Sequence, residues 1–150
     1  MGVIDKLYTS TVVVTMKVGD KLNGISVAWV TRVSWSPVML AISIGKTRYS
    51  HELLLNANGF CVCVLGKNAE KVAEHFGTLS GRDVNKFATV PYSFSKRGYP
   101  VPEGTIAYME CEKTGSFEAG DHTIFVGRVI DGKILKDEEP MIFGEGRILP

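Results

Sequence analysis

Short β-forming segments separated by turn residues constrain the fold of this chain more than any other feature. Within them, β-branched and aromatic residues alternate or form brief apolar runs, which is the pattern of strands rather than helices. Strands are predicted at residues 11–16, 25–35, 39–44, 60–65, 105–112 and 123–130. The last two are joined through Gly120-Asp121, as in an antiparallel hairpin. Helices do not alternate regularly with the strands, so a doubly wound sheet is not expected. The predicted fold class is mainly β, an antiparallel β-barrel with two or three short helices.

The segment 25–35 has the clearest alternation. Its large apolar side chains share one parity: Ile25, Val27, Trp29, Val33 and Trp35. Alternate residues of a strand face the same side, so both tryptophans are expected in the core. Small or polar side chains occupy most of the other parity: Ser26, Ala28, Arg32 and Ser34. A face of small residues is what a flat aromatic ligand would need.

Two helices and one long loop complete the expected elements. Thr47 is expected to cap a helix that ends near Asn56. Asn68 is expected to cap a second helix, which Gly77 would stop. Several glycines and prolines fall within residues 79–102, which predicts a long, partly ordered loop. Loops of that length inside a compact domain usually have a function.

Length and charge exclude several classes of protein. The 150 residues suit one domain, residues 1–150, and 45% of them are hydrophobic, as in ordinary globular proteins. A net charge of +1 gives no electrostatic basis for binding nucleic acid or a membrane surface. The three cysteines match no zinc spacing, and Cys61 and Cys63 are expected to pack in the core. No metal site is expected, and a cytoplasmic location is expected because no secretory leader is recognisable.

Residues 44–50 combine a strand end with a helix start that carries cations and hydroxyls. A phosphate-binding P-loop is excluded, because the required glycine is replaced by Leu40. Free N–H groups at a helix start can nevertheless bind an anion. The side chains available for this are Lys46, Thr47, Arg48 and Ser50. Basic residues oppose the dipole at a helix N-terminus, so a phosphate site and an ordinary surface turn both remain open.

His122 differs from the other two histidines because it follows the Gly120-Asp121 turn at the entrance of a strand. A loop in that place can direct the ring into a cleft. The alternative is that His122 only stabilises the turn. His51, on the first helix, is expected either to neighbour the anion site or to face solvent, and His75, on the second helix, is expected at the surface or half-buried.

Several separated segments together resemble the flavin reductase-like family, the FMN-binding split barrels. They are NGISVAWVT at 23–31, AISIGKTRYS at 41–50, FGTLSGRD at 76–83 with Lys86-Phe87, and GDHTIFVG at 120–127. The segments cover nearly the whole chain in the order found in the family. A shorter C-terminus is the main departure from longer members, which puts the features near the dimer interface in question.

The resemblance implies a six-stranded split barrel that binds FMN noncovalently, usually as a homodimer. It places the flavin against residues 23–31, with its phosphate near residues 46–50, and His122 near the reactive ring or the nicotinamide site. The residues implied in cofactor binding are Asn23, Ser26, Ala28, Trp29, Thr31, Lys46, Thr47, Arg48, Ser50, Ser80, Gly81, Arg82 and Lys86.

Three functions follow as hypotheses. The first is an NAD(P)H-dependent FMN oxidoreductase that reduces free flavin, ferric chelates or a partner protein. The second is an FMN electron carrier of the flavoredoxin type, reduced by a protein donor. The third is a ligand-binding β-barrel without redox activity. Because a flavin carries the hydride chemistry itself, no acid–base pair in the sequence separates the first two.

Overall fold

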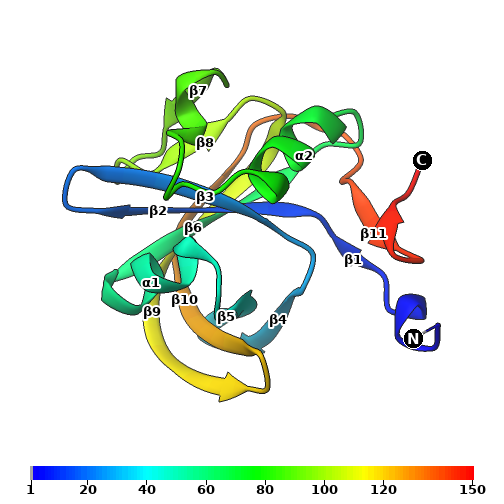
Figure 1. The fold of residues 1–150 in the computed structure, drawn as a ribbon, viewed down its shortest axis with the longest axis horizontal. Helices are drawn as coiled ribbons and strands as arrows, with labels where there is room; N and C mark the ends of the chain where they lie inside the picture. The colour runs from blue at the N-terminus through cyan, green and yellow to red at the C-terminus, as the bar shows by residue number, and fades with distance from the viewer. Residues whose placement is uncertain (1) are drawn as a thin grey trace.

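The computed structural model describes residues 2–150, and most of its elements are strands (Figure 1). The helical elements are η1 (Ile4–Lys6), α1 (Tyr49–Asn56), α2 (Glu70–Thr78) and η2 (Lys86–Ala88), where η marks a 3-10 turn. The strands are β1 (Thr9–Ser10), β2 (Val12–Val18), β3 (Lys21–Val27), β4 (Val30–Trp35), β5 (Val38–Gly45), β6 (Gly59–Leu65), β7 (Tyr92–Phe94), β8 (Pro100–Pro102), β9 (Thr105–Ala119), β10 (His122–Ile134), β11 (Ile142–Gly144) and β12 (Arg147–Ile148). The predicted mainly β class, with two α-helices, is confirmed.

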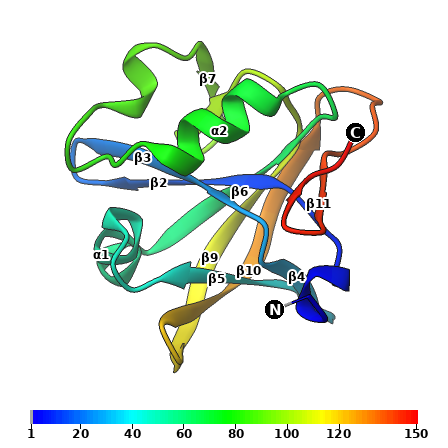
Figure 2. The ribbon, with the colours of Figure 1, turned by 45° about the vertical axis from the view of Figure 1, so that its right-hand side comes forward.

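Seven antiparallel strands form one sheet in the order β3-β2-β6-β9-β10-β5-β4. β9 and β10 form the predicted hairpin, in which His122 pairs with Ala119. The sheet curves so that β2 and β3 lie opposite β4 and β5 (Figure 2). Its edge strands β3 and β4 follow each other in the chain, and among residues 2–150 no ladder between them closes the sheet. Two small sheets, β1-β11-β12 and β7-β8, lie beside it.

The predicted strand 25–35 is two strands, broken at Ala28 and Trp29. The Ala28 carbonyl accepts a hydrogen bond from Thr9 Oγ1, and the Trp29 carbonyl accepts one from Ser43 N at 3.0 Å. Trp29 is 54% exposed and Trp35 is 77% exposed, so the expectation that both lie in the core is wrong. The alternation continues along the chain, but β4 is an edge strand with most of its side chains exposed.

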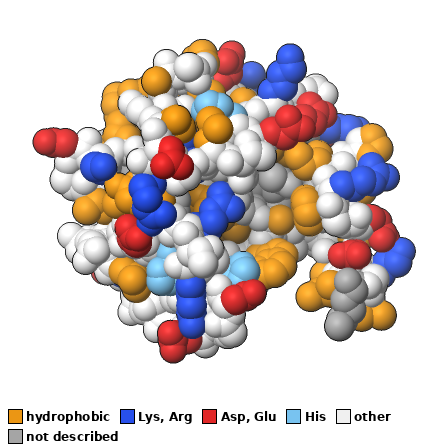
Figure 3. Space-filling model, in the orientation of Figure 1, with side chains coloured by type: hydrophobic (Ala, Val, Ile, Leu, Met, Phe, Trp, Pro, Cys, Tyr) orange, Lys and Arg blue, Asp and Glu red, His pale blue; other side chains and the backbone are white. Residues whose placement is uncertain are grey.

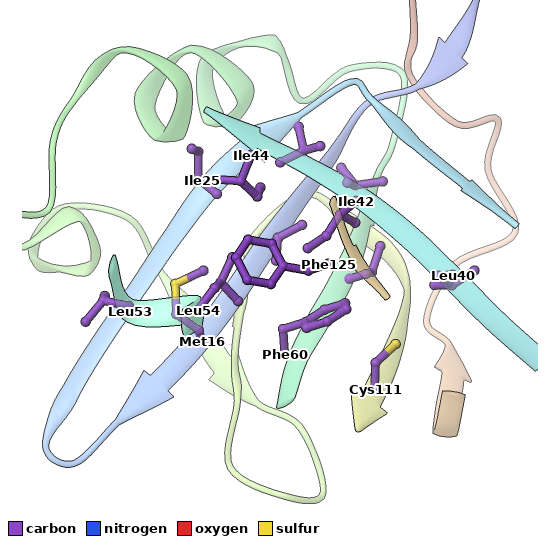
Figure 4. Close-up of a cluster of buried hydrophobic side chains, with 14 residues drawn as sticks. Met16, Ile25, Leu40, Ile42, Ile44, Leu53, Leu54, Phe60, Cys111 and Phe125 are labelled. Atoms are coloured by element: carbon purple, nitrogen blue, oxygen red, sulfur yellow. The ribbon is translucent and has the colours of Figure 1, made fainter. Parts of the chain in front are cut away.

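Two cores use opposite faces of β2 and β6. Inside the curved sheet, Val12, Val14 and Met16 pack with Phe60 and Phe125 (Figure 4). On the outer face, Val13 packs beneath α2 in a second cluster that includes Cys61, Cys63 and Phe76. Burial on both faces explains why residues 11–16 form a continuous β-branched run rather than an alternation. The predicted core location of Cys61 and Cys63 is confirmed.

Both predicted helix starts are wrong. A turn in which Arg48 N donates to Gly45 O at 3.1 Å delays α1 to Tyr49, so its N-cap is Arg48 and not Thr47. The N-cap of α2 is Ala69 and not Asn68. Gly77 lies inside α2 instead of stopping it. A Cβ at Gly77 would lie 3.5 Å from Ser26 Cβ, so this glycine belongs to a close contact between helix and strand.

Residues 79–102 are more regular than the predicted loop, because they contain η2 and the β7-β8 ribbon. A fully buried carboxylate anchors this segment from β9. Glu110 accepts hydrogen bonds from Ser95 Oγ at 2.6 Å, Arg97 N at 2.8 Å and Arg97 Nη1 at 3.0 Å. Since a buried carboxylate requires such partners, it fixes the connection between β7 and β8 against the main sheet.

A substitution at Gly59 can test how tightly β6 packs against β9. A Cβ at Gly59 would overlap the backbone carbonyl oxygen of Cys111. We therefore expect Gly59→Ala to lower the free energy of unfolding by about 1–3 kcal/mol, measured by urea denaturation. Gly115→Ala is the matched control, because no heavy atom lies within 4 Å of its added Cβ. Equal midpoints for the two variants would show that β6 and β9 tolerate the separation that the methyl group requires.

Candidate functional site

A groove of about 540 Å³ opens beside the break between β3 and β4. The end of β5, the turn before α1 and the start of β10 form its other sides. Basic and histidine side chains gather around a hollow on the face drawn in Figure 3. The groove brings together six of the residues predicted from the sequence: Ser26, Ala28, Trp29, Thr47, Arg48 and His122.

The floor of the groove consists of small side chains. Ser26 donates its hydroxyl hydrogen to Ala73 O at 2.6 Å, so the hydroxyl is occupied by α2. Ala28 and Ser43 continue the floor from β3 to β5. These three small side chains would leave room for a flat ring, and Ile25, Val27 and Ile44 add apolar surface to the lining.

His122 and Trp29 form one wall. Their ring centroids lie 4.6 Å apart with the planes tilted by 35°. His122 Nδ1 lies 2.7 Å from Asp121 Oδ1, and this hydrogen bond lowers the pKa of Asp121 below its ordinary value. The ionised Asp121 accepts a hydrogen bond from Nδ1–H, and the Nε2 edge of the His122 ring faces Gly45 and the groove.

Cationic and hydroxyl groups lie at the end of the groove next to α1. Arg48 lines it and also donates Nη2–H to Gly77 O at 3.1 Å. Thr47 lies beside Arg48, and the N–H groups of the first helical turn lack intrahelical acceptors. Lys46 is outside the groove lining, where its Nζ pairs with Glu118 at 3.0 Å. This end has the chemistry of an anion site.

Three predicted residues lie together beneath the groove rather than in it. Asn23 Nδ2 donates to Ser50 Oγ at 2.9 Å, and both side chains are buried. The Gly81 backbone lies against Asn23, where a Cβ would overlap the amide oxygen. These contacts connect β3, α1 and the segment after α2.

Three other predicted residues, Ser80, Arg82 and Thr31, lie outside the groove lining. Ser80 Oγ accepts from Arg82 N at 3.2 Å, and Arg82 pairs with Glu52. Arg82 lines a second pocket of about 420 Å³, and its guanidinium carbon lies 5.2 Å from the centroid of the Tyr49 ring. Thr31 lines an adjacent pocket of about 550 Å³ between β4, β5 and η1.

Lys86 is buried, with 2% of its surface exposed. Its Nζ donates to Gly24 O at 2.7 Å and to Phe76 O at 3.2 Å. Burial, followed by the charge of Arg48, lowers the pKa of Lys86 to about 8. The ammonium is turned toward backbone carbonyls, and Lys86 does not line the groove.

Sequence reasoning missed Asp121, Gly45, Ser43 and Phe143 as groove residues. Asp121 had a local signal, since a carboxylate adjacent to a histidine at a turn can orient the ring. No local sequence signal identified Phe143, because the pairing of β11 with β1 brings it to the groove from the far end of the chain.

The donor set fits a flat aromatic group that carries a phosphate. The small side chains would hold the ring, and Arg48 with the start of α1 would hold the anion. Among residues 2–150, no cluster of three His, Cys, Asp or Glu side chains is arranged to hold a metal ion. No helix in the same range is long and apolar enough to cross a membrane. The fold is therefore a curved antiparallel sheet with a groove that small, cationic and aromatic side chains line.

Comparison with known proteins identifies the family. The model of the flavin reductase-like domain matches residues 5–149. A NADH-dependent FAD reductase of Streptomyces globisporus is 36% identical over 141 residues, which are 93% of this chain and 77% of that protein. A high molecular weight rubredoxin of Moorella thermoacetica is 35% identical over 133 residues, 87% of this chain, and the chain spans 58% of that protein's length. This chain belongs to the flavin reductase-like family, as its sequence predicted.

Solved structures that are similar to this chain support the same family assignment. The NADH:FAD oxidoreductase of Streptomyces globisporus C-1027 superposes with a TM-score of 0.93 at 34% identity, covering 99% of this chain and 89% of the other. An FMN-binding protein of Thermus thermophilus superposes with a TM-score of 0.86 at 27% identity, covering 95% and 86%.

The buried ammonium of Lys86 predicts a pH dependence of stability. Between about pH 8 and 10.5, the unfolded chain holds a proton on this lysine that the folded chain has lost. The stability of the wild type should therefore rise through this window relative to Lys86→Met, by roughly 1–3 kcal/mol. Urea denaturation of both proteins at several pH values measures the difference. A difference that stays constant with pH would show that Lys86 keeps an ordinary pKa in the fold.

Proposed function

We propose that this protein binds FMN noncovalently in the groove and acts as an NAD(P)H-dependent oxidoreductase that reduces free flavin or a ferric chelate. One observation carries the proposal: the groove joins a floor of small residues to a cationic helix start at Thr47 and Arg48. The names of the relatives support flavin and reduced nicotinamide as reactants, because they include an NADH-dependent FAD reductase and an FMN-binding protein.

The bound flavin would supply the hydride chemistry, and the protein supplies position and electrostatics. Arg48 and Thr47 bind the phosphate, while Lys46 adds positive charge at the rim. Ser26, Ala28 and Trp29 receive the ring. His122, oriented by Asp121, offers its Nε2 edge to the ring or the nicotinamide.

The remaining predicted residues act around this groove. Asn23, Ser50, Gly81 and Lys86 support it from beneath, through the contacts of β3 with α1 and α2. Gly81 and Arg82 line the second pocket, where a second nucleotide would bind, and Ser80 precedes them in the chain. Thr31 borders the pocket beside β4.

The proposal extends to architecture and assembly. The six-stranded split barrel is part of the proposal, in which β3 and β4 of the seven-stranded sheet count as one bent strand. A homodimer, with the flavin close to the subunit boundary, is supported by the pocket of about 550 Å³ beside the exposed Trp29. Light scattering tests the dimer, and a stable monomer with bound FMN would contradict it.

A cytoplasmic location and a single domain over residues 1–150 are also part of the proposal. The cytoplasmic location fits an odd number of cysteines, all buried.

Anaerobic reduction separates the three hypotheses. The FMN-loaded protein is mixed with NADH or NADPH, and the oxidised flavin band is followed. We expect bleaching without any partner protein. Bleaching only with a reduced protein donor would identify an electron carrier. Failure to bind flavin at all would leave a β-barrel without redox activity.

Arg48 should discriminate between flavins with and without a phosphate. A charge-assisted hydrogen bond contributes about 1.5–3 kcal/mol, so Arg48→Ala should weaken FMN binding roughly 10- to 150-fold and riboflavin binding much less. Flavin fluorescence titration measures both affinities. Arg128→Ala is the control, because Arg128 is exposed on β10 and pairs with Glu112. Equal losses for the two ligands in Arg48→Ala would place the phosphate elsewhere.

His122 should support electron transfer more than folding. We expect His122→Asn to retain its melting temperature and most of its FMN, and to be reduced by NADH at least about tenfold more slowly, because the reactants lose a positioning contact. Stopped-flow absorbance and thermal melts test this. Lower thermal stability combined with a wild-type reduction rate would make His122 a structural residue.

A further inference from the structure

Two cations from distant parts of the chain hold the C-terminal end of α2. Arg48 donates to Gly77 O at 3.1 Å, and Lys86 donates to Phe76 O at 3.2 Å. The last carbonyls of a helix lack intrahelical donors and carry the negative end of its dipole. The end of α2 therefore connects Lys86 to Arg48, which lines the groove.

Lys86 also fixes how closely α2 approaches β3. Its ammonium also donates to Gly24 O at 2.7 Å, on β3, which contributes residues to the groove floor. A Cβ at Gly24 would lie 3.1 Å from the Phe76 ring, so helix and strand are already in close contact there. The carbonyl of Lys86 itself accepts a hydrogen bond from His75 Nε2 at 2.6 Å. Both ends of the residue are thus held.

No ion pair compensates this buried ammonium among residues 2–150. The charged or titratable groups that face it are Arg48, from the turn before α1, and His75 of α2. β3 offers a carbonyl, and Arg82 in the preceding loop is engaged by Glu52. Arg48 therefore places a positive charge near the ammonium, and an anion bound at Arg48 would supply the missing negative charge.

We propose that Lys86 is a positioning and specificity-determining residue for phosphate-bearing flavins. It sets the place of Arg48 through the end of α2, and the phosphate bound by Arg48 stabilises its charge. The inference rests on the proposed function, since it needs the flavin phosphate at Arg48.

A pH-dependent preference for FMN follows. Near pH 8 the free protein is partly deprotonated at Lys86. The phosphate, whose second pKa is about 6, is already a dianion there. A dianion at Arg48 favours the charged lysine, so FMN binding takes up protons. Above that range FMN affinity falls, by about tenfold for each pH unit by which the complex raises the pKa of Lys86. Riboflavin has no phosphate and should show no such dependence.

Isothermal titration calorimetry in two buffers of different ionisation enthalpy tests the proposal at a pH just above about 8. We expect proton uptake with FMN and none with riboflavin. Lys86→Met should abolish the uptake, and Lys86→Arg should keep strong FMN binding without it. Lys113→Met is the matched control. The pKa of Lys113 is also lowered by burial, and Lys113 donates to Leu54 O and Leu55 O at the opposite end of α1 from the groove.

Equal proton uptake with both flavins, or uptake that survives in Lys86→Met, would overturn the proposal. Should Lys86→Met fail to fold, the comparison of FMN with riboflavin on the wild type decides, and no uptake with FMN would be a refutation. Absence of any flavin binding would refute the proposed function as well. Binding of both flavins without a pH-linked difference would refute the role of Lys86 alone.

Discussion

The break at Ala28–Trp29 is the constraint on which the rest of the structure depends. It lets one stretch of chain form both edges of the curved sheet, and it removes Trp29 from the core. Hydrogen bonds from Thr9 and Ser43 hold the two carbonyls at the break. Ala28 and Trp29 both line the groove, and Trp29 also lines the pocket beside β4.

The close packing of α2 on β3 is the second requirement, because it places the cations. Gly24 allows the helix to approach closely, and Ser26 donates a hydrogen bond to it. Lys86 and Arg48 then bind carbonyls at its end. Charge at the groove is therefore coupled to packing several residues away, which is why a buried lysine can influence a ligand that it does not touch.

The sequence predicted local features well and long-range ones poorly. Period-two alternation and short β-branched or apolar runs identified the strands, and the Gly120-Asp121 turn identified the hairpin. Alternation could not show that the environment changes at Ala28, because exposure depends on which strands lie alongside. The start of α1 was missed by one residue, since the turn at Gly45 satisfies Arg48 N first. The resemblance gathered residues 26–29, 47–48 and 122 at one site, but it could not show that the Lys86 ammonium turns inward.

Crystals grown with FMN test the central claim most directly, because they show where the flavin lies. The account predicts density for the ring over Ser26 and Ala28, beside the Trp29–His122 pair, and density for the phosphate at Arg48 and the start of α1. Ring density confined to the pocket between η1, β4 and β5, or a phosphate distant from Arg48, would contradict it.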